Sequence, residues 1–420
     1  MAFADDKKQI LIIGGSYAGV STAHYLLKHV IPKLPDRESY QVVLISTSSQ
    51  TMCRPAAPRA LLSDTQFPQD KLFVSIPASF VQYGPDSFIF KQGTATALDH
   101  ENRTVSVHLA MTNDGSSTEV KITYYALVIA TGASTPSPLL GFTRDEAVLK
   151  SSWAAFRKAL PNAKHIVVAG GGASGVEVAG ELGEYLNGRA GWLSSTMPNP
   201  KVQITLLSGG LRILPYLRPA IAQKAETYLA KVGVRVVNKA RVSTVVPATA
   251  GTEDVTADAT LTLDNGEELH ADLYIPAIGA IPNTAFVPEA LRRPDGRVDT
   301  NASTLRVVKA GERVYAIGDA ASAARPAIHN IFSMVPVLCT NIRRDLLLAM
   351  GRAPQTVGED RVFNEDIRET QLVPIGKSQG VGAAMGYKLP SFLVWLIKGR
   401  DYWLWTTGNL WSGKHWAKES

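Results

Sequence analysis

A glycine-rich turn near the start of the chain has the residue types and the spacing of a phosphate-binding site. Gly14, Ser16 and Gly19 stand in the spacing G-x-S-x-x-G, directly after the apolar, β-branched residues 10–13. Such a strand–turn–helix unit can bind a dinucleotide pyrophosphate, because the helix N-terminus offers unpaired N–H groups and the positive end of its dipole. The candidate contacts of this turn are Gly14, Gly15, Ser16, Ala18 and Gly19.

A second turn of the same kind follows within residues 164–183, about 155 residues further along the chain. Here Gly170, Gly172 and Gly175 fill all three glycine places, and Ser174 stands between the last two. Two such units in one chain indicate that two dinucleotides meet. The usual pair is a flavin that is held permanently and a nicotinamide that comes and goes, so the expected chemistry is hydride transfer.

Both units lack the acidic residue that usually binds a ribose at the end of the next strand. Strand 41–45 ends in Ser46, which is a weaker hydroxyl partner. Strand 202–207 ends in Ser208, with Arg212 nearby. An acid would favour NADH, whereas a nearby arginine tolerates a 2′-phosphate. We therefore expect NADPH to be used at least comparably to NADH.

Two strand ends are expected to approach the flavin. Residues 124–134 give a buried strand that ends in small residues, which let the chain pass close to a nucleotide. Residues 313–321 give a strand that is followed by a glycine and an aspartate. That aspartate could bind ribityl or phosphate-linked hydroxyls, or it could be a plain turn residue. The residues concerned are Ala130, Thr131, Gly132, Gly318 and Asp319.

A helix and a proline-spaced segment are also expected near the flavin. The pattern of residues 333–349 predicts an amphipathic helix with Pro336 in its first turn, and a helix N-terminus aimed at the flavin would stabilise its anionic reduced ring. Segment 51–62 carries Arg54 and Arg59, either of which could lie by the flavin or be a solvated arginine. The further candidates are Ala95 in the hairpin-like stretch 92–109, Gly279 in the stretch 273–284, and Val335.

Length and composition describe a globular chain with more than one core. At 420 residues, with 45% apolar and 19% charged residues, two or three domains are expected. The formal charge of +6 suits an anionic surface or ligand, but no interleaved basic and aromatic run favours nucleic acid. The two cysteines, Cys53 and Cys339, are far apart and are expected to be buried in a reducing compartment. No metal-ligand spacing is found, so no metal is expected.

Residues near the two ends of the chain bear on the question of whether the protein associates with a membrane. The N-terminal residues have no apolar signal core, Ala2 does not allow N-myristoylation, and no apolar run is long enough to span a bilayer. Five of the seven tryptophans lie in the last 26 residues, together with several lysines and arginines. This tail, residues 388–420, is expected to lie on a membrane surface, with packing as a dimer surface or core cover as the alternative.

Taken together, these motifs resemble the flavoprotein disulfide reductase superfamily with two dinucleotide domains, also called the pyridine nucleotide-disulfide reductases. Within it the chain is similar to the apoptosis-inducing-factor-like branch and its ferroptosis suppressor proteins, notably in the tail sequence GKSQGVGAAMGYKLPSFLVWLIKGRDYW. The resemblance implies an FAD-dependent NAD(P)H:quinone oxidoreductase, related also to type II NADH dehydrogenases. The paired cysteines of the disulfide reductases are missing, which disfavours a dithiol acceptor.

The resemblance also implies roles for individual residues. Arg59 matches a basic residue near the flavin, Asp319 matches the FAD-binding aspartate, and Glu177 matches a glutamate near the nicotinamide and the flavin. The flavin carries the chemistry, so Glu177 is the one candidate for a catalytic residue. Ser46 and Ala2 depart from the family, in the ribose contact and the lipid anchor respectively.

The expected fold is α/β, with two Rossmann-like domains and a small C-terminal region. The boundaries are 1–140 and 285–352 for the two parts of the FAD domain, 141–284 for the NAD(P) domain and 353–420 for the C-terminal region. We expect a cytoplasmic protein, with a peripheral place on an intracellular membrane (the mitochondrial outer surface or a lipid droplet) implied by the resemblance, and a homodimer as a candidate assembly. Two alternatives to quinone reduction stay open: a reductase of a small electron-carrier protein, and a redox-sensing interaction protein.

Overall fold

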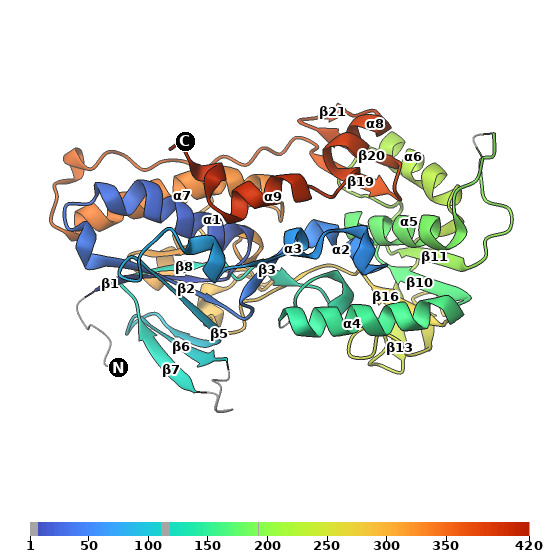
Figure 1. Cartoon of the computed structure of the whole chain (residues 1–420), viewed down its shortest axis with the longest axis horizontal. Helices are drawn as coiled ribbons and strands as arrows, with labels where there is room; N and C mark the ends of the chain where they lie inside the picture. Colours follow the sequence, from blue (N-terminus) through green and yellow to red (C-terminus); the bar gives the residue numbers. More distant parts are fainter. Residues whose placement is uncertain (1–6, 111–117, 144, 192, 420) are drawn as a thin grey trace.

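The computed structural model describes residues 7–110, 118–143, 145–191 and 193–419, so the expectation for Ala2 lies outside the described residues. Its largest sheet has seven strands (Figure 1). The first five are parallel, because apolar runs such as residues 10–13 can be buried on both faces, and the last two complete an antiparallel meander. In spatial order the strands are β18 (Val314–Ala316), β8 (Ala126–Ile129), β1 (Lys8–Ile13), β2 (Tyr40–Ser46), β5 (Phe88–Asp99), β6 (Thr104–Leu109) and β7 (Glu119–Thr123).

A second parallel sheet of four strands forms the other half of the molecule. Helix α5 packs on its β11 and β10, and helix α6 packs on β12. A three-stranded antiparallel sheet lies beside it, with a tight turn at residues 264–266. The elements are β10 (His165–Ala169), β11 (Gln203–Ser208), β12 (Val234–Asn238), β16 (Leu273–Pro276), α4 (Glu146–Ala159), α5 (Ala173–Asn187), α6 (Pro219–Ala230), β13 (Val242–Val246), β14 (Ala259–Leu263) and β15 (Glu268–Ala271).

Helix α1 (Tyr17–Tyr25) and helix α7 (Ile328–Ala349) pack against each other on one face of the large sheet (Figure 1). Strand β9 (Ala133–Ser134) pairs with β17 (Ile281–Pro282), where the chain passes between the two halves. These parallel sheets with helices confirm the α/β class and the Rossmann-like character expected from the sequence. The domain boundaries given above stay a prediction. The short elements between β2 and β5 are β3 (Gln50–Met52), α2 (Ala57–Ala60), α3 (Gln69–Leu72) and β4 (Phe73–Ser75).

The C-terminal region is a small sheet followed by helical segments that lie across both halves. Strand β19 packs on α5 of the second half, while α9 lies beside α1 of the first (Figure 1). In the described part of the chain, no helix is long and apolar enough to cross a membrane. The elements are β19 (Gln371–Ile375), β20 (Gln379–Ala384), β21 (Tyr387–Lys388), α8 (Ser391–Val394), the π-helical turn η13 (Trp395–Gly399) and α9 (Leu404–Trp411).

The end of the tail covers the core of the first half. The side chains of Trp411 and Trp416 are buried in the cluster that contains α1. His24 of α1 lies 2.8 Å, through its Nε2, from the carbonyl oxygen of Trp411, and Lys28 Nζ donates to the carbonyl of Gly413 at 2.5 Å. The tail is therefore a core cover at this end, which is the alternative that the sequence left open.

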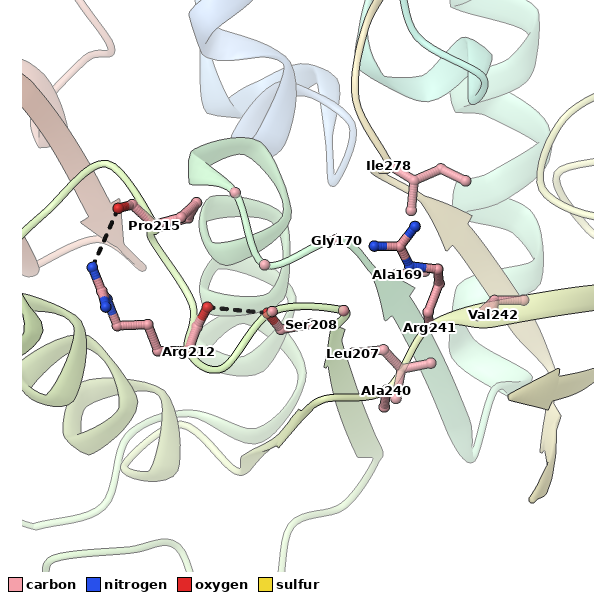
Figure 2. Close-up of a pocket in the computed structure, with 14 residues that line it drawn as sticks. Ala169, Gly170, Leu207, Ser208, Arg212, Pro215, Ala240, Arg241, Val242 and Ile278 are labelled. Atoms are coloured by element: carbon pink, nitrogen blue, oxygen red, sulfur yellow. Dashed lines mark hydrogen bonds between the residues drawn. The ribbon is translucent and has the colours of Figure 1, made fainter. Parts of the chain in front are cut away.

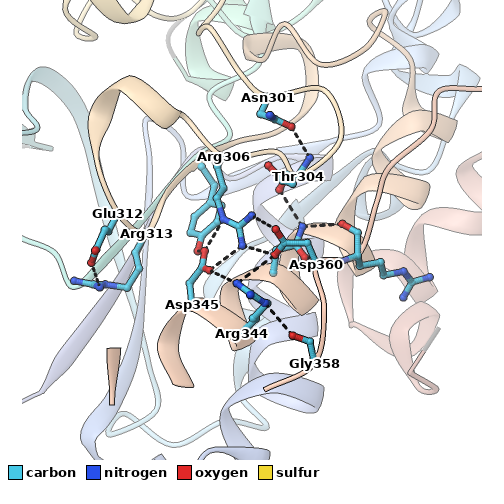
Figure 3. A network of polar contacts seen from close by, with 12 residues as sticks. Asn301, Thr304, Arg306, Glu312, Arg313, Arg344, Asp345, Gly358 and Asp360 are labelled. Carbon is cyan, nitrogen blue, oxygen red and sulfur yellow. Dashed lines mark hydrogen bonds and ion pairs between the residues drawn. The ribbon is translucent and has the colours of Figure 1, made fainter. Parts of the chain in front are cut away.

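A charged network fixes the long link that leads to the C-terminal region (Figure 3). Arg306 donates from Nε to Asp345 of α7 and from Nη2 to Asp360 of the link, both at 2.7 Å. The Tyr315 hydroxyl also donates to Asp345, at 2.5 Å. The Arg306 guanidinium holds the pKa of Asp360 below its usual value. The network therefore joins β18, α7 and residues 358–361.

Candidate nucleotide and redox site

The first glycine turn packs so closely on the end of β8 that no side chain fits. A Cβ on Gly14 would lie 2.1 Å from the carbonyl oxygen of Ala130, and a Cβ on Gly19 would lie 1.7 Å from the carbonyl oxygen of Gly14. Gly14 also has φ +122°, which glycine adopts readily. The turn thus brings the N-terminus of α1 against the A-T-G segment, as expected. The hydroxyl of Thr131 in that segment is buried without a hydrogen-bond partner among the described residues.

The ends of β2 and β18 meet the same turn. A Cβ on Gly15 would lie 2.6 Å from Ser46 Oγ, and a Cβ on Gly318 would lie 3.2 Å from the Cβ of Ala18. Gly15, Ala18, Ser46 and Gly318 are therefore brought together as the sequence predicted. Ala95 lies on β5, three positions beyond Gln92, the residue that pairs with Ser46.

Asp319 and Arg54 form the charged part of this first site. Burial raises the pKa of Asp319, and Arg54 and Arg297 oppose that rise. Arg54 donates from Nη1 to the carbonyl of Ala133 at 2.6 Å, which fixes it beside the A-T-G segment. A tight glycine cradle, a buried unpartnered hydroxyl and an arginine with a neighbouring carboxylate fit the pyrophosphate and polyol of FAD.

Arg59 lies in a different environment from the one expected. Its side chain is 5% exposed, and its Nη2 donates to Glu181 of α5 at 2.7 Å. The other donors are used by the second Glu181 oxygen and by the carbonyls of Gly376, Gly399 and Arg400. The guanidinium therefore has no donor left for a flavin, and we correct its role to that of a structural ion pair. Arg54 is the arginine beside Asp319.

The expectation for Pro336 and Val335 is wrong in its geometry. Helix α7 begins at Ile328, so Pro336 lies well inside the helix, and both residues are buried in its interior packing. The start moves because Ala327 is extended, with φ −165°, and the helix can begin directly after it. The first turn of α7 still borders the site, since a Cβ on Gly318 would lie 3.8 Å from Ile331.

The second glycine turn repeats the geometry of the first. A Cβ on Gly170 would lie 2.2 Å from the carbonyl oxygen of Ala277, and one on Gly175 would lie 1.9 Å from the carbonyl oxygen of Gly170. Gly172 is the N-cap of α5 and faces open space, and Ser174 is exposed in the first turn. The N-terminus of α5 is therefore open to a ligand, while the glycines behind it allow close packing.

A cavity of about 520 Å³ opens in front of this turn (Figure 2). It is bordered by the turn, by the loop after β11 and by residues 240–242. Ser208 lines it, as expected. Arg212 also lines it, but its Nη2 is 3.3 Å from the carbonyl oxygens of Pro215 and Leu217, and Figure 2 shows it directed away toward Pro215. Gly279 follows Ile278, which lies at the rim.

The guanidinium of Arg241 is the feature of this cavity that sequence reasoning missed. Figure 2 shows it extending toward Ile278 and Ala169. Arg241 lies after β12 and outside the glycine motif of the second turn. The one feature of the sequence that could have pointed to it is a positive charge shortly after β12, the third parallel strand of the second half.

A buried ion pair lies on α5 behind the second turn. Glu177, 4% exposed, accepts a hydrogen bond from Lys398 of η13, which is 8% exposed and also donates to the carbonyl of Leu372 at 3.1 Å. Burial raises the pKa of Glu177 to about 7, and the Lys398 charge opposes the rise. One turn later Glu181 binds Arg59 and accepts from the Tyr402 hydroxyl at 2.9 Å. The same face of α5 thus ties both halves to the C-terminal region. The sequence singles out Glu177, whereas Lys398 falls within the tail 388–420 that is expected to lie on a membrane surface.

The two cysteines cannot serve as a dithiol. Cys53 and Cys339 are both fully buried and belong to different hydrophobic clusters. Burial raises the pKa of the Cys53 thiol to about 11 and that of Cys339 well above its ordinary value. Neither thiol has the thiolate character that disulfide exchange needs.

Comparison with known proteins finds one family and several full-length relatives. Residues 8–337 match the family described as pyridine nucleotide-disulphide oxidoreductase. The chain is 62% identical over 418 residues to oxidoreductase phnG of Penicillium herquei, covering 99% of both chains. It is 25% identical to ferroptosis suppressor protein 1 of Xenopus laevis, covering 94% of both. Among solved structures, NDH2 from Plasmodium falciparum in complex with RYL-552 matches with a TM-score of 0.63 and 15% identity, over 99% of both chains.

Proposed function

The chain belongs to the pyridine nucleotide-disulphide oxidoreductase family, whose members use FAD and NAD(P)H, and from this premise we propose that it is an FAD-dependent NAD(P)H:quinone oxidoreductase. Membership confirms the superfamily that the sequence resembled, and the ferroptosis suppressor protein 1 relatives agree with the branch. An oxidoreductase using FAD and NAD(P)H accounts for two glycine turns on two parallel sheets. What we propose is that the acceptor is a quinone, that FAD binds at the first turn and that NAD(P)H binds at the second.

We assign FAD to the first turn. The N–H groups at the start of α1 would bind its pyrophosphate, Ser46 its ribose and Asp319 its polyol chain, with Arg54 balancing the phosphate charge. When bound, FAD accepts a hydride from NAD(P)H and passes the electrons on to an acceptor. The nucleotide that delivers the hydride would bind through the N-terminus of α5 in the cavity at the second turn.

Glu177 and Lys398 would position the two nucleotides relative to each other. They lie buried on α5, the helix that starts at the second turn, and Lys398 belongs to the C-terminal region. Holding this region against α5 excludes water from the interior next to the turn. A buried pair of opposite charge also fixes the register of the two elements that carry it.

The observation that carries the quinone assignment is the two-sided character of α8 and η13. One side holds Lys398 on Glu177, while the other exposes Phe392 at 63%, Leu396 at 46% and Trp395 at 36%. This apolar surface lies on the same segment as Lys398, whose partner Glu177 is buried behind the second turn. Such a surface suits a hydrophobic acceptor. The buried thiols described above give no dithiol alternative.

The same apolar surface supports a peripheral place on a membrane. Lys388 and Arg400 flank it, and aromatic and basic side chains favour the headgroup layer. The expected tail anchor 388–420 is thereby reduced to α8, η13 and the exposed Trp405, because the end of the tail is packed on α1. The expected homodimer stays a prediction.

The proposal is tested by comparing acceptors at equal NADPH. Turnover is measured with a short-chain water-soluble quinone, with a long-chain quinone in anionic liposomes, and with a small iron–sulfur carrier protein. Quinone turnover well above carrier turnover is expected. The double variant Phe392→Glu/Leu396→Glu should lose turnover with the liposomal quinone only, and Val308→Glu, on an exposed apolar residue elsewhere, should lose neither activity. Turnover that depends on the carrier protein would contradict the quinone assignment.

A further inference from the structure

We propose that Arg241 recognises the 2′-phosphate of NADPH and thereby sets the nucleotide preference of this protein. The inference rests on the proposed nicotinamide site at the second turn and assigns to Arg241 the role that the sequence gave to Arg212.

The backbone next to Arg241 is tied to the loop that follows β11. Lys239 N donates to the carbonyl of Gly210 at 2.8 Å, and Ala240 N donates to the carbonyl of Ser208 at 2.9 Å. On the other side, Asp264 N donates to the carbonyl of Arg241 at 2.8 Å. These bonds fix the start of the Arg241 side chain beside the strand end where nucleotide ribose is read in Rossmann folds.

The guanidinium of Arg241 lies over the loop, and no residue that the structure describes pairs with it. A Cβ on Gly209 would be 3.2 Å from Arg241 Nε, so the absence of a side chain at Gly209 makes room for the guanidinium. Among the described residues, no hydrogen bond or ion pair engages the Arg241 side chain. Arg212, in contrast, is held by the carbonyls of Pro215 and Leu217 and faces away from the cavity (Figure 2).

The charges around the cavity favour a phosphate. Its lining holds no acidic side chain among the described residues that form it, and Arg241 is the lining arginine whose guanidinium extends into the cavity (Figure 2). The acid nearest in the hydrogen-bond pattern is Asp264, whose carboxylate accepts from Arg241 N at 3.3 Å and so lies on the backbone side. A guanidinium that is not already paired can bind phosphate oxygens in a bidentate manner. NADH has no group to fill this place.

The test measures binding without redox chemistry. The full-length, FAD-loaded protein is titrated calorimetrically with adenosine 2′,5′-bisphosphate and with 5′-AMP, which differ in the 2′-phosphate alone. We expect the bisphosphate to bind at least about tenfold more tightly to the wild type, roughly 1.4 kcal/mol. Arg241→Gln should reduce that preference to less than about threefold and leave 5′-AMP binding unchanged. Arg212→Gln and Lys239→Gln are matched controls that should keep the preference.

The outcomes separate this inference from the proposed function. If 5′-AMP and NADH bind but the wild type shows no preference for the bisphosphate, or if Arg241→Gln keeps the preference, Arg241 is not the phosphate-binding residue. If neither 5′-AMP nor NADH binds the wild type, the nicotinamide site itself is wrong and the inference falls with it. Unchanged FAD content and circular dichroism of Arg241→Gln show that the variant is folded, and Arg241→Lys should restore part of the preference.

Discussion

Replacing Lys398 by methionine should turn Glu177 into a carboxyl group that must stay protonated in the folded protein. The substitution keeps the length of the side chain and removes the charge that opposes the burial-induced rise in the pKa of Glu177. Breaking a buried ion pair from one side costs about 3–5 kcal/mol, unless the remaining group neutralises itself. Glu177 can do so by binding a proton, and the cost then depends on pH.

The sign and size of that dependence follow from proton linkage. The pKa of Glu177 is raised in the folded state, so the folded protein holds more protons than the unfolded chain above the unfolded value of 4.5, and stability falls as the pH rises. In the wild type the fall ends near the folded pKa of about 7. In Lys398→Met it should continue at about 1.36 kcal/mol per pH unit, or about 2.7 kcal/mol from pH 6 to pH 8.

The assay is urea unfolding followed by tryptophan fluorescence at pH 6, 7 and 8, with FAD in excess. The gap in free energy of unfolding between the wild type and Lys398→Met should widen from pH 7 to pH 8. Lys388→Met, on an exposed lysine, should show no gap, and Glu177→Gln/Lys398→Met should lose the extra pH slope. A gap that stays constant, or that is larger at pH 6 than at pH 8, would refute the reasoning.

Three other perturbations have expected outcomes. The side chain of Trp411 is 1% exposed, and its ring lies tilted with its centroid 4.7 Å from that of Tyr17. Trp411→Ala should therefore lower the free energy of unfolding by about 3–5 kcal/mol in the same urea assay, and a loss under about 1 kcal/mol would show that the tail is no core cover. Burial lowers the pKa of His24 to about 4. The neutral imidazole therefore contributes about 3 kcal/mol to the free energy of unfolding above pH 6.5, and this contribution should be lost as the pH falls toward 4. His24→Gln should flatten that part of the profile of stability against pH, and an unchanged profile would contradict a buried neutral imidazole. The Cβ added by Gly175→Ala would lie 1.9 Å from the carbonyl oxygen of Gly170. This variant should keep FAD and weaken NADPH binding at least about tenfold, as measured by calorimetry. Loss of FAD alone would reverse the assignment of the two turns.

The parts of the fold that local patterns encode could be predicted from the sequence. The glycine spacing and the β-branched runs place both turns correctly, because a Cβ at these glycine positions would lie about 2 Å from a carbonyl oxygen, so that only glycine is accepted. Ser46, Gly318 and the A-T-G segment also lie where strand ends of a parallel sheet must meet. Such features depend on the strand–turn–helix unit itself.

The parts decided by contacts between distant segments could not be predicted in this way. Arg59 is bound by Glu181 and by carbonyls of residues 376–400, and this pairing has no local signature. Trp411 and Trp416 looked like membrane residues by composition but are buried against α1. Arg241 reaches the cavity only because residues 239–240 bond to the loop after β11.

The central claim is that this chain transfers reducing equivalents from a nicotinamide nucleotide through FAD to a quinone. The most direct measurement is an anaerobic visible-absorption titration of the purified protein, first with NADPH and then with one equivalent of a water-soluble quinone. We predict a yellow protein whose oxidised flavin bands bleach with NADPH and return with the quinone. Protein that cannot be loaded with FAD, flavin that stays oxidised with both NADPH and NADH, or reduced flavin that the quinone does not reoxidise would contradict the account.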